Sequence, residues 1–369
     1  MRNVAVLANQ AKSLVSSNPS IETVDMHTVP VTCGVVVTRP PRLDPKSDEH
    51  RLRVVVRIKA FSCNYRDQTF IIAASRKARD FSCYVIGSDF MGEVVAIGAD
   101  VRTLAVGDRV IGNNAYHGLS ESEPLVRQGV PSNHASAEYQ VLSESQVIKI
   151  PPSMPDDKAA AFSINSQTAY SMVRRIGVSE GDHVLVTAAR SNTSLATIGA
   201  LRKHQTNVYA LTTSRGYEPR FAELGVAEVI HNSDEERLID LARSIGGFQC
   251  VVDPFFDLHL KRVAFLLAPG GRYTSCGVWR QYQDLLSSEA RPPVLDLSMP
   301  LSQCISNNIQ LIFNCLGSRS DLAQAIEDYA AGDFDIVIDS TYSGNQVGAF
   351  LGRTFTSADR FGKVVYRYA

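Results

Sequence analysis

Hydrophobic and polar positions divide the chain into two regions with different periodicity. Before the Pro151-Pro152 pair, short runs rich in β-branched residues are separated by turns that contain Gly, Pro or Asp. The runs predict strands at Cys33–Thr38, Leu52–Ala60, Phe90–Ile97, Arg109–Ile111 and Tyr139–Leu142. Such closely spaced strands, without helical periodicity between them, predict a rolled β domain.

After Pro152, strands and helices alternate. Met154–Arg175 has helical periodicity, and the alternation continues to residue 314. The predicted strands are His183–Thr187, Asn207–Thr212, Glu228–His231, Cys250–Asp253, Arg272–Cys276 and Ile309–Asn314. The predicted helices are Ser194–Lys203, Glu218–Leu224, Leu238–Ile245 and Leu258–Leu267. This alternation indicates a parallel, doubly wound sheet, and a last helix, Asp321–Ala330, returns toward the first region.

Length and charge narrow the class of protein. A chain of 369 residues exceeds what one hydrophobic core usually serves, so two domains are expected. The formal charge is −1, from 37 Lys and Arg against 38 Asp and Glu, and no block of like charge stands out. Because phosphate backbones require a concentrated basic surface, a nucleic-acid partner is disfavoured.

The chain carries no signal for a membrane or for secretion. No apolar run approaches the roughly 20 residues that cross a bilayer, and the N-terminus lacks the basic-then-apolar order of a signal peptide. The seven cysteines are scattered and form no CxxC pair. We therefore expect a soluble, cytoplasmic protein with reduced thiols and no membrane partner.

Short motifs in a fixed order carry a resemblance to a known family. They are Ser62-Cys63-Asn64-Tyr65-Arg66-Asp67, Gly87-Ser88-Asp89, Val106-Gly107-Asp108-Arg109-Val110, Ala137-Glu138-Tyr139, Thr168-Ala169-Tyr170, Ala268-Pro269-Gly270-Gly271-Arg272 and Phe361-Gly362-Lys363-Val364-Val365. In this order they resemble the medium-chain dehydrogenase/reductase superfamily, specifically its zinc-independent branch of quinone and enoyl reductases. The similarity covers roughly residues 33–369.

The resemblance implies an α/β fold with two domains. A rolled β, GroES-like catalytic domain is expected at residues 1–160 and 317–369, and a doubly wound Rossmann dinucleotide-binding domain at 161–316. It also implies a homodimer joined by edge-to-edge pairing of Ile309–Asn314, a run that is apolar and has an otherwise open edge.

Two departures from the family concern zinc. Zinc-dependent members have a Cys where this chain has Asn64 and a His where it has Ser88, and neither replacement is a credible zinc ligand. The cysteines of the structural zinc lobe are also missing, because residues 113–137 contain none. His117 and His134 lie in that stretch without a third ligand, so we expect no bound metal.

The loop expected to bind the cofactor diphosphate departs further. The family has a glycine-rich turn there, whose backbone amides approach a pyrophosphate at a helix N-terminus. Here the turn is Ala188-Ala189-Arg190-Ser191-Asn192-Thr193-Ser194-Leu195. Arg190, Ser191, Asn192, Thr193 and Ser194 offer phosphate donors, and we favour retained binding. A degenerate loop that only caps its helix is the alternative.

Cofactor choice is predicted from the end of the next strand. NAD-specific folds place an acidic residue there, whereas this chain has Thr212-Thr213-Ser214-Arg215. With no carboxylate and one guanidinium, a 2′-phosphate is accommodated, so Thr213, Ser214 and Arg215 predict NADPH. Arg215 as a solvated helix-start residue is the alternative.

Without a metal, reduction of a polarised double bond needs a positioned nicotinamide, donors for the developing oxyanion and a proton. Candidate catalytic residues are Tyr65 as acid or oxyanion donor, Asn64 as amide donor and His134 as proton relay. The resemblance implies that Thr168 contacts the nicotinamide, and Cys276, Val278 and Asn314 are expected around the ring. Packing roles for Tyr65 and Cys276, and a plain loop role for His134, remain open.

A polar segment, Trp279–Pro293, leaves the parallel sheet at the expected nicotinamide end. It predicts a substrate-binding loop with Trp279 as an aromatic wall, or a Trp279 that closes the interdomain cleft.

The leading hypothesis is an NADPH-dependent reductase of an activated C=C bond, in an enone, a quinone or a carrier-bound enoyl thioester. A cyclase or isomerase that has lost the dinucleotide and a cofactor-sensing protein are the alternatives. The reaction class is implied by the resemblance in fold.

Overall fold

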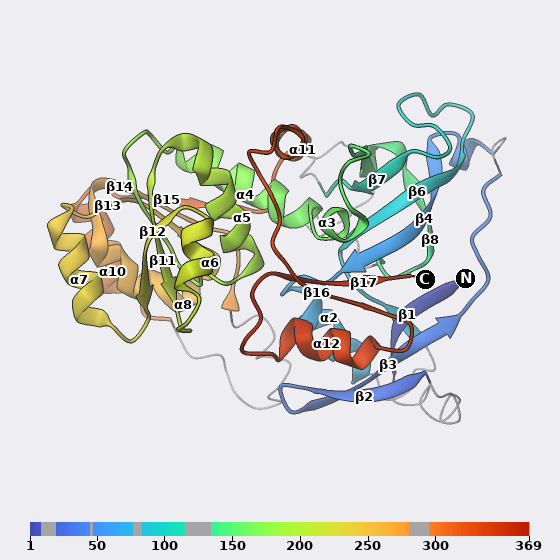
Figure 1. Ribbon diagram of the computed structural model, residues 1–369, viewed down its shortest axis with the longest axis horizontal. Helices are drawn as coiled ribbons and strands as arrows, with labels where there is room; N and C mark the ends of the chain where they lie inside the picture. Colours follow the sequence, from blue (N-terminus) through green and yellow to red (C-terminus); the bar gives the residue numbers. More distant parts are fainter. Residues whose placement is uncertain (9–19, 45–46, 77–82, 115–133, 280–294, 369) are drawn as a thin grey trace.

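The computed structural model describes residues 1–8, 20–44, 47–76, 83–114, 134–279 and 295–368 (Figure 1). Two architectures occupy separate parts of the molecule: a parallel sheet with helices on both sides, and antiparallel sheets nearer the two termini. Among these residues, no helix combines the length and the apolar character that a membrane span requires.

Six parallel strands form the first part, in the order β12-β11-β10-β13-β14-β15. They are β10 (His183–Val186), β11 (Asn207–Thr212), β12 (Val226–His231), β13 (Phe248–Asp253), β14 (Leu267–Ser275) and β15 (Gln310–Phe313). The helices of this part are α4 (Ser163–Ile176), α5 (Asn192–Leu201), α6 (Glu218–Glu223), α7 (Glu235–Ser244), α8 (Phe256–Val263) and α10 (Ser298–Ser306), with short 3-10 turns η3 (Arg202–His204) and η4 (Ala264–Leu266).

Both faces of this sheet are buried, which explains its unbroken apolar strands. Val184 and Val186 of β10 pack into the cluster that includes α4 and α5, while Leu185 packs into the opposite cluster with α7 and α8. Strands covered on both faces carry continuous hydrophobic runs in place of alternating ones. The doubly wound sheet expected from the sequence is confirmed.

Antiparallel pairing builds most of the second part, and one pair, β16 with β17, is parallel. A seven-stranded sheet runs β16-β17-β4-β6-β7-β9, with β8 paired to β4, and a four-stranded sheet runs β2-β3-β1-β5. The strands are β1 (Arg2–Leu7), β2 (Ile21–Met26), β3 (Val29–Val37), β4 (Arg53–Ser62), β5 (Cys83–Val85), β6 (Asp89–Ile97), β7 (Arg109–Gly112), β8 (Tyr139–Ser143), β9 (Val147–Lys149), β16 (Ile338–Ser343) and β17 (Lys363–Arg367). The helices are α2 (Asp67–Ser75), α3 (Asp156–Ala160), α11 (Arg319–Ala331) and α12 (Val347–Phe355), with 3-10 turns η1 (Asp48–His50) and η2 (Glu144–Gln146).

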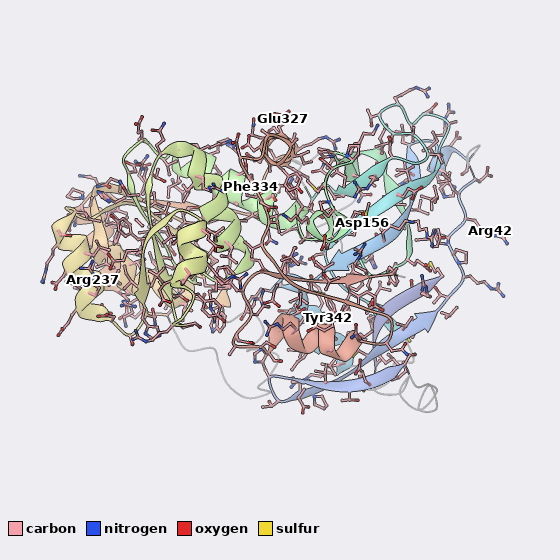
Figure 2. All side chains as sticks on the ribbon, in the orientation of Figure 1. Arg42, Asp156, Arg237, Glu327, Phe334 and Tyr342 are labelled. Carbon is pink, nitrogen blue, oxygen red and sulfur yellow. The ribbon has the colours of Figure 1, made fainter. Side chains whose placement is uncertain are left out.

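The C-terminal segment returns to the antiparallel part. Strand β17 pairs with β4, with Val365 opposite Ser62, so residues far apart in sequence become neighbours. One buried cluster contains side chains from both parts, including Ile111 of β7 and Val186 of β10. Phe334, which lies beside α4 in Figure 2, packs edge-to-face on Tyr170 with ring centroids 5.2 Å apart. A shared core therefore holds the two parts together.

Candidate functional site

A cavity of about 600 Å³ is lined by residues of both parts of the molecule. The parallel sheet contributes the residues that follow β10, β11, β13, β14 and β15, at the carboxyl ends of these strands. The antiparallel part contributes Cys63–Arg66, which follow β4, and residues between Thr354 and Arg360, which precede β17. Ligands of doubly wound sheets bind at the carboxyl ends of the strands, so this cavity is the candidate site.

The loop between β10 and α5 lines the cavity although it contains no glycine. Ala188 has a φ of 40°, in the left-handed region that favours glycine, so the tight turn is made by a residue with a Cβ. Four of the five predicted phosphate contacts line the cavity: Arg190, Ser191, Asn192 and Thr193.

Ser194, the fifth, lies outside the cavity lining. Its hydroxyl donates to the Thr187 carbonyl at 2.8 Å, and its backbone N–H donates to Oγ of Ser191, the N-cap of α5, at 3.1 Å. Ser194 therefore stabilises the start of the helix, contrary to the role we expected for it. The N–H groups of Asn192 and Thr193, in the first turn, have no partner within the helix.

Two arginines meet at this helix N-terminus. Arg190 donates to the carbonyl oxygens of Ala358 at 2.8 Å and Arg360 at 3.1 Å, and Arg360 donates to Oδ1 of Asn192 at 3.0 Å. Burial lowers the pKa of the Arg360 guanidinium to about 10, opposed by Asp339 and reinforced by the neighbouring Arg190 charge. Among the described residues, the bonds recorded for both guanidinium groups are to neutral oxygens. The two guanidinium groups give this end of the cavity a positive charge.

Only one of the three residues expected to select NADPH lines the cavity. Thr213 does, whereas Ser214 and Arg215 do not. The Ser214 backbone N–H donates to Oγ1 of Thr212 at 3.3 Å, and the Arg215 side chain is exposed. Arg215 thus lies at the margin of the site, beyond the last residue of this segment that reaches the cavity wall.

Three of the four candidate nicotinamide contacts line the cavity. Thr168 of α4 lines the cavity, as do Cys276 and Val278 after β14. Asn314 does not: its amide donates to the Leu316 carbonyl at 2.6 Å and accepts from the Ser171 hydroxyl at 2.8 Å. Asn314 therefore holds the turn after β15 and, contrary to expectation, does not line the cavity.

A buried hydrogen-bond network includes Asn64 and Ser88, the two positions where the resemblance implies zinc ligands in zinc-dependent members. The Asn64 amide donates to Ser88 Oγ at 3.0 Å and to Asp89 Oδ2 at 2.7 Å, and it accepts from the Lys363 ammonium. The ammonium also pairs with Asp89 at 3.0 Å, and both side chains are almost completely buried. No group of three or more potential ligands among His, Cys, Asp and Glu gathers in the described parts of the chain. The Asn64 amide has no donor left for a substrate oxygen.

Asp67 is the titratable member of this network. Its Oδ2 accepts from the Asn64 backbone N–H at 2.8 Å and from the Ser88 hydroxyl at 2.7 Å. Burial raises the pKa of the Asp67 carboxyl from 3.8 to about 6, because these bonds and the Lys363 charge only partly offset the desolvation. Ser88 lines the cavity and therefore connects this buried acid to it.

Tyr65 belongs to an aromatic cluster that lines the cavity. Its ring stacks on Trp279 at 5.2 Å and meets Phe255 edge-on at 5.0 Å. The Tyr65 hydroxyl donates to the Trp279 carbonyl at 2.7 Å, so its proton is directed at the backbone of the other part of the molecule. Trp279 lines the cavity as expected, while residues 280–293 of the predicted substrate loop lie outside the described residues.

His134 does not line the cavity. It is an exposed residue whose carbonyl accepts from the Ala137 backbone N–H at 2.9 Å. His117 lies outside the described residues.

Several lining residues escaped prediction from the sequence. Arg66, His259 and Arg360 all contribute to the cavity wall. Nδ1 of His259 lies 2.8 Å from Oδ1 of the buried Asp253. Arg66 lies inside one of the family motifs and Arg360 next to another, but only the fold shows that both reach this cavity.

Comparison with known proteins agrees with this arrangement. Residues 50–152 match the family profile described as the alcohol dehydrogenase GroES-like domain. The chain is 23% identical over 226 residues to human quinone oxidoreductase, covering 60% of this chain and 64% of that protein. It is 25% identical over 290 residues to a phenolphthiocerol/phthiocerol polyketide synthase of Mycobacterium tuberculosis, covering 75% of this chain but 12% of that protein.

A solved structure described as an NAD-dependent alcohol dehydrogenase superposes over the full length of both chains, with a TM-score of 0.77 and 24% identity. The fold and the cavity define a two-domain α/β protein in which a GroES-like part and a doubly wound sheet share one site. These similarities support the resemblance to the medium-chain dehydrogenase/reductase superfamily.

Proposed function

We propose that the protein is a zinc-independent, NADPH-dependent reductase of an activated C=C bond, in an enone, a quinone or an enoyl thioester. The observation that carries this proposal is the cavity itself, which joins a positive helix N-terminus to Ser88, Thr168 and the Tyr65 cluster. The quinone oxidoreductase and polyketide synthase relatives support the reaction class, although the chain spans less than two thirds of either protein.

The residues around α5 fit a dinucleotide diphosphate. The first-turn N–H groups of Asn192 and Thr193 point from a helix N-terminus, which favours an anion. Arg190 and Arg360 add two cations whose recorded bonds are to neutral oxygens, and an anion would relieve the repulsion between them. The positive charge thus compensates for the absence of glycines, which elsewhere allow closer backbone approach.

A bound dihydronicotinamide would supply a hydride to one carbon of the double bond. Thr168 and the backbone at Cys276 and Val278 would hold the ring at the carboxyl end of β14. Ser88 is the proposed proton donor, because it lines the cavity and its hydroxyl shares a 2.7 Å hydrogen bond with Asp67. A protonated Asp67 would pass its proton to Ser88 Oγ as Ser88 releases its own to the substrate.

Cofactor preference is a separate part of the proposal. The segment after β11 carries no carboxylate, and Arg215 lies exposed at the margin of the cavity. A charge-assisted contact to the 2′-phosphate is worth roughly 1.5 to 3 kcal/mol, or about ten- to a hundredfold in affinity. Arg215→Ala should therefore weaken NADPH binding by that factor and leave NADH binding nearly unchanged.

Fluorescence titration with both dinucleotides, followed by NADPH oxidation with a panel of enones and quinones, tests the function. Binding with turnover supports a reductase, binding alone a cofactor sensor, and neither a cyclase or isomerase without redox chemistry. If wild type binds neither dinucleotide at millimolar concentration, the reductase proposal fails. If NADPH binds but Arg215→Ala changes neither affinity, only the specificity argument fails.

A further inference from the structure

Arg66 has a cationic side chain at the cavity whose two terminal nitrogens form no hydrogen bond and no ion pair within 4.0 Å with any described residue. It lies directly before α2 and lines the cavity, and its guanidinium lies over the Phe70 ring at 4.8 Å. Both terminal nitrogens are buried, and neither has a hydrogen-bond partner among the described residues. Burial lowers the pKa of this guanidinium, opposed by the nearby Asp67 and Cys315.

The adjacent Asp67 does not serve as its partner. The bonded oxygen of Asp67 accepts from Asn64 and Ser88, and the other oxygen is buried without a hydrogen bond from any described residue. The structure records no ion pair within 4.0 Å between Asp67 and Arg66. Arg190 and Arg360, by contrast, each donate to oxygens of the protein. Since a shielded guanidinium without a partner is costly, the missing anion is expected from a ligand.

The position of Arg66 separates it from the diphosphate site. Along the carboxyl edge of the sheet the order is β11, β10, β13, β14 and β15. The phosphate loop follows β10, whereas Arg66 lies near Cys315, which follows β15. Three strand spacings of about 4.8 Å separate these positions, or roughly 14 Å. An anion at Arg66 is therefore not the diphosphate.

We infer that Arg66 binds a carboxylate of the substrate through its two terminal nitrogens. Two free N–H donors on one planar group match a carboxylate in bidentate geometry. The nearby wall, with Phe255, Trp279 and Leu316, is apolar and suits the body of an unsaturated acid. This inference rests on the proposed reductase function and narrows its substrate to an enone or enoyl compound that carries a carboxylate.

The test compares trans-benzoylacrylate with its neutral methyl ester, which shares the enone and differs in charge. In wild type we expect the acid to have the lower KM. Arg66→Met should raise the KM of the acid about ten- to a hundredfold and change that of the ester less than about threefold. Arg66→Lys should recover part of the loss. Arg76→Met is the matched control, because Arg76 is exposed at the other end of α2 and outside the cavity lining.

Binding gives a second readout that does not depend on turnover. With NADPH present, benzoate should raise the melting temperature of wild type and of Arg76→Met but not of Arg66→Met or Arg66→Gln. Equal effects of Arg66→Met on acid and ester would show a structural role and overturn the inference. The inference would also be overturned if wild type preferred a phosphopantetheinyl thioester and Arg66→Met lost that preference, because the bound anion would then be a phosphate. If wild type does not bind NADPH, the proposed function is refuted instead.

Discussion

At the scale of single residues, a buried ammonium group lies within the hydrogen-bond network of Asn64 and Ser88, the two positions where the resemblance implies zinc ligands in zinc-dependent members. Lys363 contacts Asn64 and Asp89, and the Asn64 amide donates to Ser88. Asn64 and Ser88 therefore belong to a hydrogen-bond network that contains its own cation. A buried ion pair adds little stability compared with an apolar pair, but removing one partner leaves an uncompensated charge.

Lys363→Met should therefore lower the free energy of unfolding by about 3 to 5 kcal/mol, because Asp89 would stay buried without its counter-ion. Urea denaturation followed by circular dichroism measures the loss. Arg367→Met, on the same strand but paired to Asp156 only at 3.8 Å and half exposed, should cost less than about 1 kcal/mol. Similar losses in both variants would contradict the role assigned to the network.

Asp67 should give the protein a characteristic pH dependence. Its pKa is raised in the folded state, from 3.8 to about 6, so its contribution to stability is full below pH 3.8 and is lost as the pH rises through 6. The difference amounts to up to about 3 kcal/mol. Relative to Asp67→Asn, wild type should lose stability across this window.

The proposed proton transfer through Ser88 gives the same group a kinetic signature. If protonated Asp67 is the proton source, kcat should fall as the pH rises through about 6. Asp67→Asn should be slower and should lack this inflection, while Tyr65→Phe should keep it, because the Tyr65 hydroxyl donates to Trp279. A profile that Tyr65→Phe flattens and Asp67→Asn leaves intact would restore Tyr65 as the acid.

Sequence reasoning reached some of these residues and not others for a physical reason. Asn64, Tyr65 and Thr168 lie in motifs whose order indicates a site, and all three line the cavity. Arg66 and Arg360 are ordinary surface residue types, and their importance arises from burial and from pairing of β17 with β4. Asn314 was expected at the ring, but its amide donates to the Leu316 carbonyl in the turn after β15 and the residue does not line the cavity.

At the scale of elements, the start of α5 shows how a nucleotide-binding turn persists without glycine. The strand and the helix were predictable from alternating periodicity, with the helix beginning two residues earlier than expected. Strands β1 and β2 were not predicted, and of the two β2 has a single buried position and no clear apolar face. The N-cap of α5 is the detail on which the cofactor proposal depends.

Ser191→Ala should lower the free energy of unfolding by about 1 kcal/mol, because the Ser194 N–H would lose its acceptor at the helix N-terminus. It should also weaken NADPH binding, since the first turn of α5 would fray where the diphosphate is proposed to bind. Thermal melts with and without NADPH measure both effects. Ser179→Ala, at an exposed turn position before β10, is the control and should change neither.

At the scale of the whole molecule, the two parts are joined by contacts that close around the cavity. Tyr65 reaches Trp279 at one side, and Arg190 reaches Ala358 and Arg360 at the other. The Tyr217 hydroxyl donates to the Asp359 carbonyl at 2.6 Å, and the Tyr217 ring stacks on Phe361. Ligands that fill the cavity are thus expected to reduce the motion of the two parts relative to each other.

The outer edge of the parallel sheet leads to the last prediction, a homodimer. Strand β15 is last in the strand order, and Phe313 is 53% exposed on it. Helix α10 nearby exposes Met299 and Ile305, at 68% and 79%. An open edge next to exposed apolar side chains favours pairing with a second copy of the same strand, which buries both.

Light scattering at micromolar concentration should therefore give twice the chain mass. Ile305→Glu should shift the equilibrium toward monomer, whereas Val106→Glu, at a similarly exposed position on the antiparallel part, should not. A wild-type monomer at these concentrations would show that β15 is a free edge.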